Sequence, residues 1–169
     1  MFRLRWLVLL LCIVVLALPV AAQDMPTVGL GSTDALGQFL VGPDGLTLYM
    51  FTRDPIGESA CYDQCAEAWP PLIVDSADSV TVADGIPGVV GTTERTDGTL
   101  EVTYNGMPLY YWKDDAAVGD TLGQGRGGVW WVMPPATIYA FRHGDAAPMM
   151  EGPQGMTLYT FDNDTTMGE

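Results

Sequence analysis

Two glycine-containing turns constrain the fold of this chain more than any other feature of its sequence. Asp97-Gly98 and Asn105-Gly106 separate three short runs of strand-forming residues, 89–95, 99–104 and 107–112. Asp-Gly and Asn-Gly pairs readily adopt the positive φ angles that a two-residue hairpin turn requires, so neighbouring runs are expected to fold back on one another. The sequence therefore predicts a three-stranded antiparallel meander.

Short apolar runs and turn residues alternate along the rest of the chain as well. The further predicted strands are Gln38–Val41 and Leu46–Thr52, which form a hairpin around Pro43-Asp44-Gly45, then Val129–Met133 and Ala136–Arg142. A helix is expected only within residues 59–68. We therefore expect an all-β or nearly all-β fold, an antiparallel meander in a sandwich or a partly open barrel, with one short helix that carries Cys61 and Cys65.

The first residues are typical of an export signal. Met1–Arg5 contains two arginines and no acid, and Trp6–Ala22 runs without a charge and ends in small residues. This order predicts a signal peptide over residues 1–22 with cleavage before Gln23. A retained membrane anchor is the alternative, because about 17 to 25 apolar residues are enough to cross a bilayer. Residues 23–36, rich in Gly, Thr, Ser and Pro, are expected to form a flexible tether.

Charge and compartment limit the partners of the exported chain. Without residues 1–22 it has five basic and 21 acidic side chains, a net charge of −16. Such a charge repels nucleic acid and anionic membrane surfaces, so we expect neither nucleic-acid binding nor membrane insertion after signal cleavage.

Export also takes Cys61 and Cys65 to a compartment where disulfides persist, and the Cα atoms of helical positions four apart lie within the distance range of a disulfide. The two cysteines are therefore expected to pair.

A sequence pattern recurs along the chain. GPDGLTLYMFTRD at 42–54 and GPQGMTLYTFDND at 152–164 share Gly-Pro, Gly, Thr-Leu-Tyr, Phe and Asp, and residues 105–115 form a looser copy. Each copy places a tyrosine five positions before an aspartate. The three pairs are Tyr49 with Asp54, Tyr110 with Asp115, and Tyr159 with Asp164.

With this motif the chain resembles a family of secreted bacterial repeats, often described as predicted lipoproteins of unknown function. The other matching segments are Cys61-Tyr-Asp-Gln-Cys65 with Trp69-Pro-Pro-Leu72, Thr103–Tyr110, Gly119-Asp120, and Gly123-Gln-Gly125 before Val129-Trp130. The resemblance covers roughly residues 38 to 133. It implies an envelope-associated module, usually in tandem copies, without an established activity or ligand.

Two departures from the family pattern bear on the expected organisation. The cysteine for lipid attachment is missing, so membrane tethering by a lipid is not expected. The later copy stops near the point where its own cysteine pair would begin. We therefore expect a repeat β domain over 37–145 and the start of a truncated copy over 146–169. That copy is either part of a longer tandem protein or a hairpin docked on the preceding strands.

The tyrosine and aspartate of each motif suit either a ligand-binding pair or a structural role. Residues five apart on a strand face opposite sides of the sheet. The structural interpretation is favoured: the aspartate begins the turn after the strand and accepts backbone N–H bonds, and the tyrosine joins the core or a cross-strand aromatic pair.

Tryptophans and acidic loops supply the remaining candidates for ligand contact. The aromatic residues that are candidates for stacking on a sugar are Trp69, Trp112, Trp130 and Trp131. Neighbouring rings on a strand point to opposite faces, so at least half of these tryptophans are expected in the core.

The candidate oxygen ligands for calcium are Asp114, Asp115, Asp120, Asp162 and Asp164. Their spacing does not match that of an EF-hand loop. His143 is the only histidine and Met149-Met150 the only methionine cluster, which gives copper little support.

Catalytic motifs are absent from the sequence. It contains no Gly-x-Ser-x-Gly elbow, no His-Glu-x-x-His helix and no phosphate-binding glycine loop. We expect no metal and no cofactor. The sequence favours a non-catalytic exported module of the periplasm or outer cell envelope that acts through protein or glycan contacts. The alternatives are a secreted carbohydrate-active enzyme with a carboxylate pair, which needs a concave site with exposed tryptophan, and a calcium-binding envelope protein.

Overall fold

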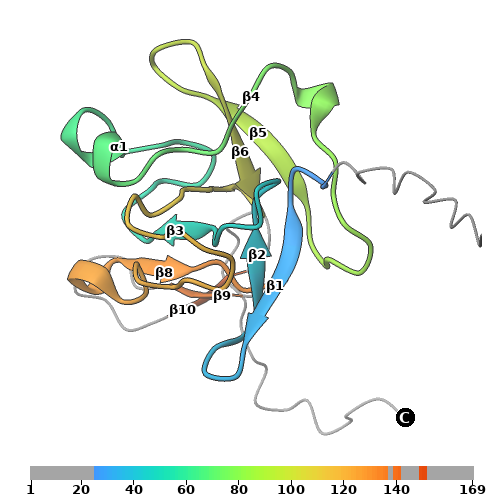
Figure 1. Cartoon of the computed structure of the whole chain (residues 1–169). Helices are drawn as coiled ribbons and strands as arrows, with labels where there is room; N and C mark the ends of the chain where they lie inside the picture. Colours follow the sequence, from blue (N-terminus) through green and yellow to red (C-terminus); the bar gives the residue numbers. More distant parts are fainter. Residues whose placement is uncertain (1–24, 137–138, 142–148, 152–169) are drawn as a thin grey trace, which may run out of the picture.

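A computed structural model of the chain describes residues 25–136, 139–141 and 149–151, with side chains described for 25–136. Its elements in order are β1 (Gly29–Thr33), β2 (Gly37–Val41), β3 (Tyr49–Phe51), α1 (Gln64–Ala68), β4 (Ile73–Val74), β5 (Val90–Glu94), β6 (Leu100–Tyr104), β7 (Met107–Pro108), β8 (Trp130–Val132), β9 (Tyr139–Phe141) and β10 (Met149–Glu151). Two short 3-10 turns lie at Ala77–Ser79 and Arg126–Gly128. Figure 1 shows small antiparallel sheets arranged without closing into a barrel in the described part of the chain. The expected nearly all-β antiparallel fold is confirmed.

The predicted meander is confirmed as β5, β6 and β7. Val90 pairs with Tyr104 in β6, and Tyr104 pairs with Met107 in β7. The turns have the backbone that their sequences favour, because Gly98 and Asn105 both have positive φ angles, 83° and 51°. The outer side of β6 also receives the short strand β4, so β6 is the centre of this sheet.

The first predicted hairpin is also present, but it has an additional strand. Leu48 donates its backbone N–H to the carbonyl of Leu40 at 2.9 Å, which joins the two predicted segments. On its other side β2 pairs along its whole length with β1. Residues 29–33, which lie within the tether expected over 23–36, form β1 because their backbone groups find partners in β2.

The helix is shorter than expected and carries only one of the two cysteines. Asp63 has a φ of 48°, which an α-helix does not accommodate, so α1 begins at Gln64. Cys61 lies before this break and Cys65 lies within α1. The two sulfurs are bonded, with the Cα atoms 5.2 Å apart. The expected disulfide is formed, but it links a loop to the helix.

Two sets of backbone bonds connect segments that are far apart in sequence. Leu72 donates to Leu109, Leu109 to Val102, and Val102 to Leu72, all at 2.8 to 3.0 Å. An equivalent cycle joins Leu40, Met133 and Leu48: Leu40 donates to Met133, Met133 to Leu48, and Leu48 to Leu40. The segment around Leu72 thus closes the meander, and the segment around Met133 closes the first hairpin. Each closing segment comes from the other half of the chain.

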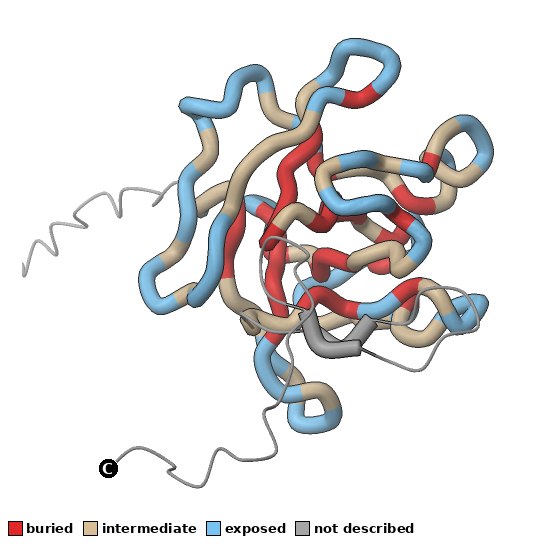
Figure 2. The backbone as a smooth tube through the Cα atoms, turned by 180° about the vertical axis from the view of Figure 1, so that it is seen from behind, coloured by how far each residue is buried: buried red, intermediate tan, exposed pale blue. Residues whose placement is uncertain are grey.

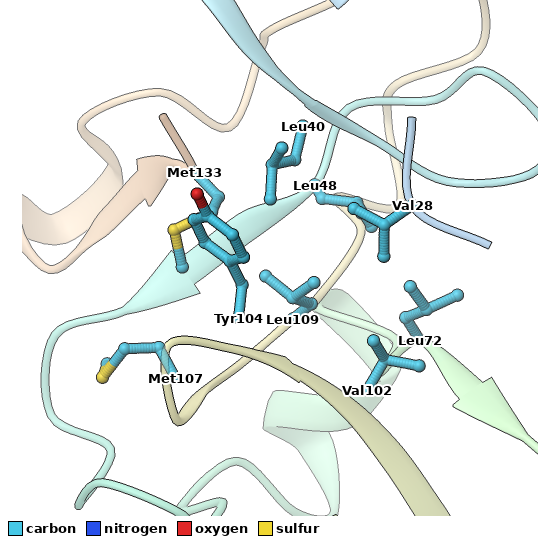
Figure 3. Close-up of a cluster of buried hydrophobic side chains, with 9 residues drawn as sticks. All are labelled: Val28, Leu40, Leu48, Leu72, Val102, Tyr104, Met107, Leu109 and Met133. Atoms are coloured by element: carbon cyan, nitrogen blue, oxygen red, sulfur yellow. The ribbon is translucent and has the colours of Figure 1, made fainter. Parts of the chain in front are cut away.

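The apolar core lies between these two closures. Figure 3 shows its buried members, which are Val28, Leu40, Leu48, Leu72, Val102, Tyr104, Met107, Leu109 and Met133. Five of the six leucines and methionines in this cluster also make the backbone cycles. Buried segments are concentrated on the central strands, and exposed ones on the loops (Figure 2). Packing and backbone pairing therefore fix the same junction.

A further hairpin lies at the end of the described residues. β9 and β10 pair with Tyr139 opposite Glu151 and Phe141 opposite Met149. The corresponding pairs in β1 and β2 are Gly29 with Val41 and Gly31 with Phe39, each 110 positions earlier. The boundary expected at residue 146 lies between β9 and β10, the two strands of this hairpin.

Candidate functional site

The tyrosines of the first two motifs meet at the centre of the molecule. Tyr49 lies in β3 and Tyr110 follows β7, and their backbones form an antiparallel bridge. The N–H of Tyr49 donates to the carbonyl of Tyr110 at 2.7 Å, and the N–H of Tyr110 donates back at 3.0 Å. The bridge places the two motifs face to face about a local pseudo-twofold axis.

The side chains of the two motifs then cross this axis. The hydroxyl of Tyr49 donates to Asp115 Oδ2 at 2.6 Å, and the hydroxyl of Tyr110 donates to Asp54 Oδ2 at 2.8 Å. All four residues are buried. Each tyrosine therefore bonds to the aspartate of the other copy rather than to the aspartate five positions along its own chain segment.

The second oxygen of each aspartate accepts a backbone N–H from the loop that follows it. Asp54 Oδ1 accepts from Ala60 at 2.7 Å, and Asp115 Oδ1 accepts from Leu122 at 2.9 Å. The structural interpretation of the motif agrees with these contacts, because the aspartates organise turns and the tyrosines are core residues. The crossing itself was not anticipated from the sequence.

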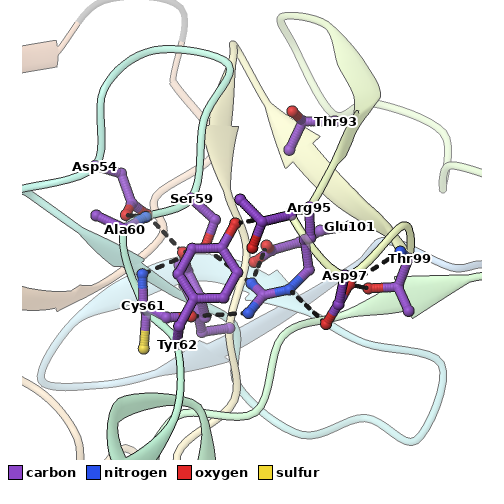
Figure 4. Close-up of polar contacts among 12 residues, drawn as sticks. Asp54, Ser59, Ala60, Cys61, Tyr62, Thr93, Arg95, Asp97, Thr99 and Glu101 are labelled. Carbon is purple, nitrogen blue, oxygen red and sulfur yellow. Dashed lines mark hydrogen bonds and ion pairs between the residues drawn. The ribbon is translucent and has the colours of Figure 1, made fainter.

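The pair formed by Asp54 and Tyr110 continues into a buried polar network (Figure 4). The Tyr110 hydroxyl lies 2.8 Å from Ser59 Oγ, which also accepts from the guanidinium of Arg95 at 2.8 Å. Arg95 donates to Glu101 at 2.6 Å and to the carbonyl of Cys61 at 2.8 Å. The network thus ties the first aspartate to the disulfide loop and to β6.

Burial governs the ionisation of this network. It raises the pKa of Asp54 to about 6, although bonds from Ala60 and Tyr110 oppose the shift. Burial likewise raises the pKa of Glu101 to about 7 against the pull of Arg95. Burial alone would lower the pKa of Arg95, but its bond to Glu101 raises it above the ordinary value. Both tyrosine hydroxyls are also buried, and the pKa of each is raised by that burial.

Stacked aromatic rings cover the crossed pairs and repeat the same symmetry. Trp69 and Trp130 stack on each other with centroids 3.9 Å apart and planes within 5°. Tyr49 meets Trp69 edge-on at 5.3 Å, and Tyr110 meets Trp130 edge-on at 5.2 Å. Each tryptophan lies 20 positions after the tyrosine that it contacts. That common spacing was the signal by which the sequence could have revealed the equivalence.

The tryptophans proposed as sugar-stacking residues separate into two groups. Trp69, Trp112 and Trp130 are 5 to 7 % exposed, and their faces contact one another or the guanidinium of Arg126, 4.1 Å above Trp112. Trp131 is 37 % exposed on β8. Only Trp131 of the four therefore presents substantial surface to a ligand.

The acidic loops make internal contacts where the structure describes them. Asp120 Oδ2 accepts the backbone N–H groups of Ala116 and Ala117, both at 2.9 Å. Asp115 is occupied by its crossed contact, and Asp114 is exposed. Within residues 25–136 no group of three or more His, Cys, Asp or Glu side chains is arranged to hold a metal ion. Tyr159, Asp162 and Asp164 lie outside the described residues, as do the side chains of Met149 and Met150.

Comparison with known protein families matches residues 32–73 and 91–133 to one family, described as a secreted repeat of unknown function. The chain belongs to this family. The two matched segments are the two copies whose motifs cross, and each match ends at a closing segment, next to Leu72 or at Met133. No curated protein and no solved structure matches the chain. Among the described residues of this secreted repeat protein, no helix is long and apolar enough to cross a membrane.

Proposed function

We propose that this secreted repeat protein is a non-catalytic module of the cell envelope that acts through contacts with proteins or glycans. One observation carries the proposal: the motif that defines the copies is buried and joins one copy to the other. The hydroxyls of Tyr49 and Tyr110 and the carboxylates of Asp54 and Asp115 satisfy one another. A protein or glycan would then be bound by the surface around this buried centre.

The same network argues against the alternative of a carbohydrate-active enzyme. Asp54 and Glu101 form the most enzyme-like carboxyl pair, because the pKa of each is raised into the range of a general acid. A glycosidase needs both carboxyls in contact with the scissile bond. Asp54 is 8 % exposed and Glu101 is 0 % exposed, and both bond to neighbouring protein groups. This burial supports a structural role for the pair.

Trp131 supports the glycan branch of the proposal. Its ring is 37 % exposed on β8, and on one side it lies close to the backbone of Gly125, where a Cβ would be 3.7 Å from the ring. An exposed indole offers a flat apolar face, the surface on which sugar rings stack. A glycan contact at this residue would leave the buried centre unchanged.

The proposal is tested with the chain of residues 23–169, immobilised and incubated with cell-envelope extract. Native mass spectrometry of the eluate is expected to show a defined protein or glycan at constant stoichiometry. For a glycan, Trp131→Ala should weaken retention, whereas Val118→Ala, a matched change at another exposed apolar residue, should not. Release of new reducing sugar ends from envelope polysaccharide by the folded protein would overturn the proposal and favour the enzyme.

A further inference from the structure

The outer edge of β5 carries backbone groups that no other described residue pairs with. β5 lies at the end of its sheet, with β6 between it and β4 (Figure 1). Thr92 lies opposite Val102 in β6, whose N–H and C=O are both used in the backbone cycle of the meander. Antiparallel bonding alternates along a strand, so the backbone groups of Val90, Thr92 and Glu94 point away from β6. Among the described residues, no donor or acceptor bonds to these outward groups.

The outward residues of β5 have equivalents in β1. Val102 and Leu40 hold equivalent places in the two backbone cycles. Thr92 lies opposite Val102, and Leu30 lies opposite Leu40. Thr92 of the second copy is therefore equivalent to Leu30 of the first.

Val28, which by the same correspondence is equivalent to Val90, shows how this edge binds an extended segment. The N–H of Val28 donates to the carbonyl of Thr81 at 3.0 Å, and the carbonyl of Val28 accepts from Ala83 at 2.9 Å. The bridge formed in this way, between Val28 and Val82, is parallel. The first copy thus holds an extended segment at the position that is open in the second copy.

The side chains around the open edge indicate which segment would fit it. Val89, just before β5, is 63 % exposed, and Glu94 at the other end of the strand is also exposed. Without residues 1–22 the chain has a net charge of −16, which attracts basic partners and repels acidic ones. A segment with an apolar residue near Val89 and a basic residue near Glu94 therefore complements the edge.

We propose that the outer edge of β5 binds an extended segment of an envelope protein, which lies parallel to β5 and places a basic side chain opposite Glu94. Strand addition of this kind takes its affinity from main-chain hydrogen bonds and its specificity from side chains. The inference rests on the protein-contact part of the proposed function and names the chemistry of the partner. It involves neither Trp131 nor the buried centre.

The probe is an acetylated and amidated peptide, Ser-Val-Thr-Val-Ala-Thr-Val-Lys, which begins with the sequence of residues 79–83. In the register of the Val28–Val82 bridge, its lysine lies opposite Glu94. The chain of residues 23–169, labelled with ¹⁵N, is titrated with this peptide and followed by NMR. The amides of Val90, Thr92 and Glu94 are expected to shift and to become protected from exchange with solvent.

Two N-methylated forms of the peptide are a matched pair. Methylation of the alanine nitrogen removes the donor that Ala83 supplies in the first copy, and it should raise the dissociation constant by about tenfold or more. The nitrogen of the preceding valine corresponds to Val82, which points away from the edge, so its methylation should leave the dissociation constant almost unchanged. Replacement of the lysine by glutamate should weaken binding several-fold.

Variants of the protein test the same edge from the other side. Thr92→Pro removes an outward donor but no bond to β6, and it should weaken peptide binding by about tenfold or more. Ser32→Pro is the matched control, because it makes the same change at an outward position of β1 and should bind the peptide as the wild-type chain does. Glu94→Lys keeps the backbone donor and should reverse the preference between the lysine and glutamate peptides. Circular dichroism establishes that each variant is folded.

Unshifted β5 amides, equal binding of the two methylated peptides, or unchanged binding to Thr92→Pro would overturn the proposal. Protection of the Val90, Thr92 and Glu94 amides in the free chain would also overturn it, because another segment would then occupy the edge. In these cases the proposed function still stands if envelope extract yields a protein or glycan. Peptide binding together with release of reducing sugar ends would instead overturn the proposed function and leave the binding edge established.

Discussion

Several polar side chains of this protein are buried and form hydrogen bonds with other buried groups. The carboxylates of Asp54 and Asp115 are buried, and each accepts one tyrosine hydroxyl and one backbone N–H. A buried charge without such partners would cost several kcal/mol, so the four bonds are a condition of the fold. Arg95 donates to one carboxylate oxygen of the buried Glu101 and also to the carbonyl of Cys61. The tyrosines and aspartates of the repeated motif are thus residues that the core cannot replace with apolar side chains one at a time.

The crossing predicts which residue pairs are coupled energetically. Tyr110→Phe and Asp54→Asn should each lower the free energy of unfolding by about 1 to 3 kcal/mol, because each leaves a buried polar partner unsatisfied. In a double-mutant cycle measured by urea denaturation, these two changes should couple by about 1 kcal/mol. Tyr110→Phe with Asp115→Asn, the pair within one copy, is the control and should be additive. Coupling confined to the same-copy pair would contradict the crossed arrangement.

Stability should depend on pH in the direction set by two carboxyls. The pKa of Asp54 is raised from 3.8 to about 6, and that of Glu101 from 4.5 to about 7. The folded state therefore binds protons more tightly than the unfolded chain, and the free energy of unfolding falls as the pH rises from about 4 to about 7. Each group contributes on the order of 3 kcal/mol. Thermal unfolding followed across this range should show a higher Tm at pH 5 than at pH 8.

The control for this pH dependence is Glu101→Gln, which removes one of the two titrating groups. It should lower stability overall, since Arg95 loses its charged partner, and it should also reduce the slope of Tm against pH. A slope equal to that of the wild-type protein would show that other groups are responsible.

At the scale of elements, loops and strands are fitted closely around the crossed pairs. Gly123 donates its N–H to the Tyr49 hydroxyl at 3.2 Å, and a Cβ at this position would lie 2.8 Å from both the Tyr49 ring and the Trp69 ring. Loop 121–128 therefore approaches the centre only because this residue lacks a side chain. In the sequence the same glycine stands out only as part of the matching segment Gly123-Gln-Gly125, which does not indicate this close approach.

Gly123→Ala should consequently destabilise the fold by about 1 to 3 kcal/mol, because the added methyl displaces packed rings. Urea denaturation measures the loss, and near-UV circular dichroism should report a changed tryptophan environment. Gly91→Ala in β5 is the matched control, since its Cβ would meet only Thr103 Oγ1 at an ordinary 3.4 Å and its backbone is extended. Equal effects of the two changes would show that the close approach at Gly123 carries no special cost.

At the scale of the whole molecule, the two copies are interleaved. The segment after α1 in the first copy closes the sheet of the second copy through Leu72, and the end of the second copy closes the first hairpin through Met133. Trp69 and Trp130 stack across the same junction. A single copy would expose its half of the core and lose its closing strand.

Residues 23–88, which contain only the first copy, should therefore not unfold cooperatively. Leu40 and Leu48 would lack the backbone partner at Met133, and Tyr49 would lack Asp115. Residues 23–136, which contain both copies, are the control and should show one cooperative transition. Thermal scans by circular dichroism distinguish these outcomes. A cooperative transition in the shorter chain would contradict the interdependence of the copies.

The sequence by itself determined what depends on neighbouring residues. Asp97-Gly98 and Asn105-Gly106 specify hairpins because their preferred φ angles are local, and the recurring tyrosine and aspartate mark the copies. Only the tertiary structure decided that each tyrosine bonds to the aspartate of the other copy, that residues 29–33 form a strand, and that Arg95 meets Glu101. The physical reason is that contacts within a copy and contacts between two copies require the same residues at the same spacing. Packing of the complete chain selects between them.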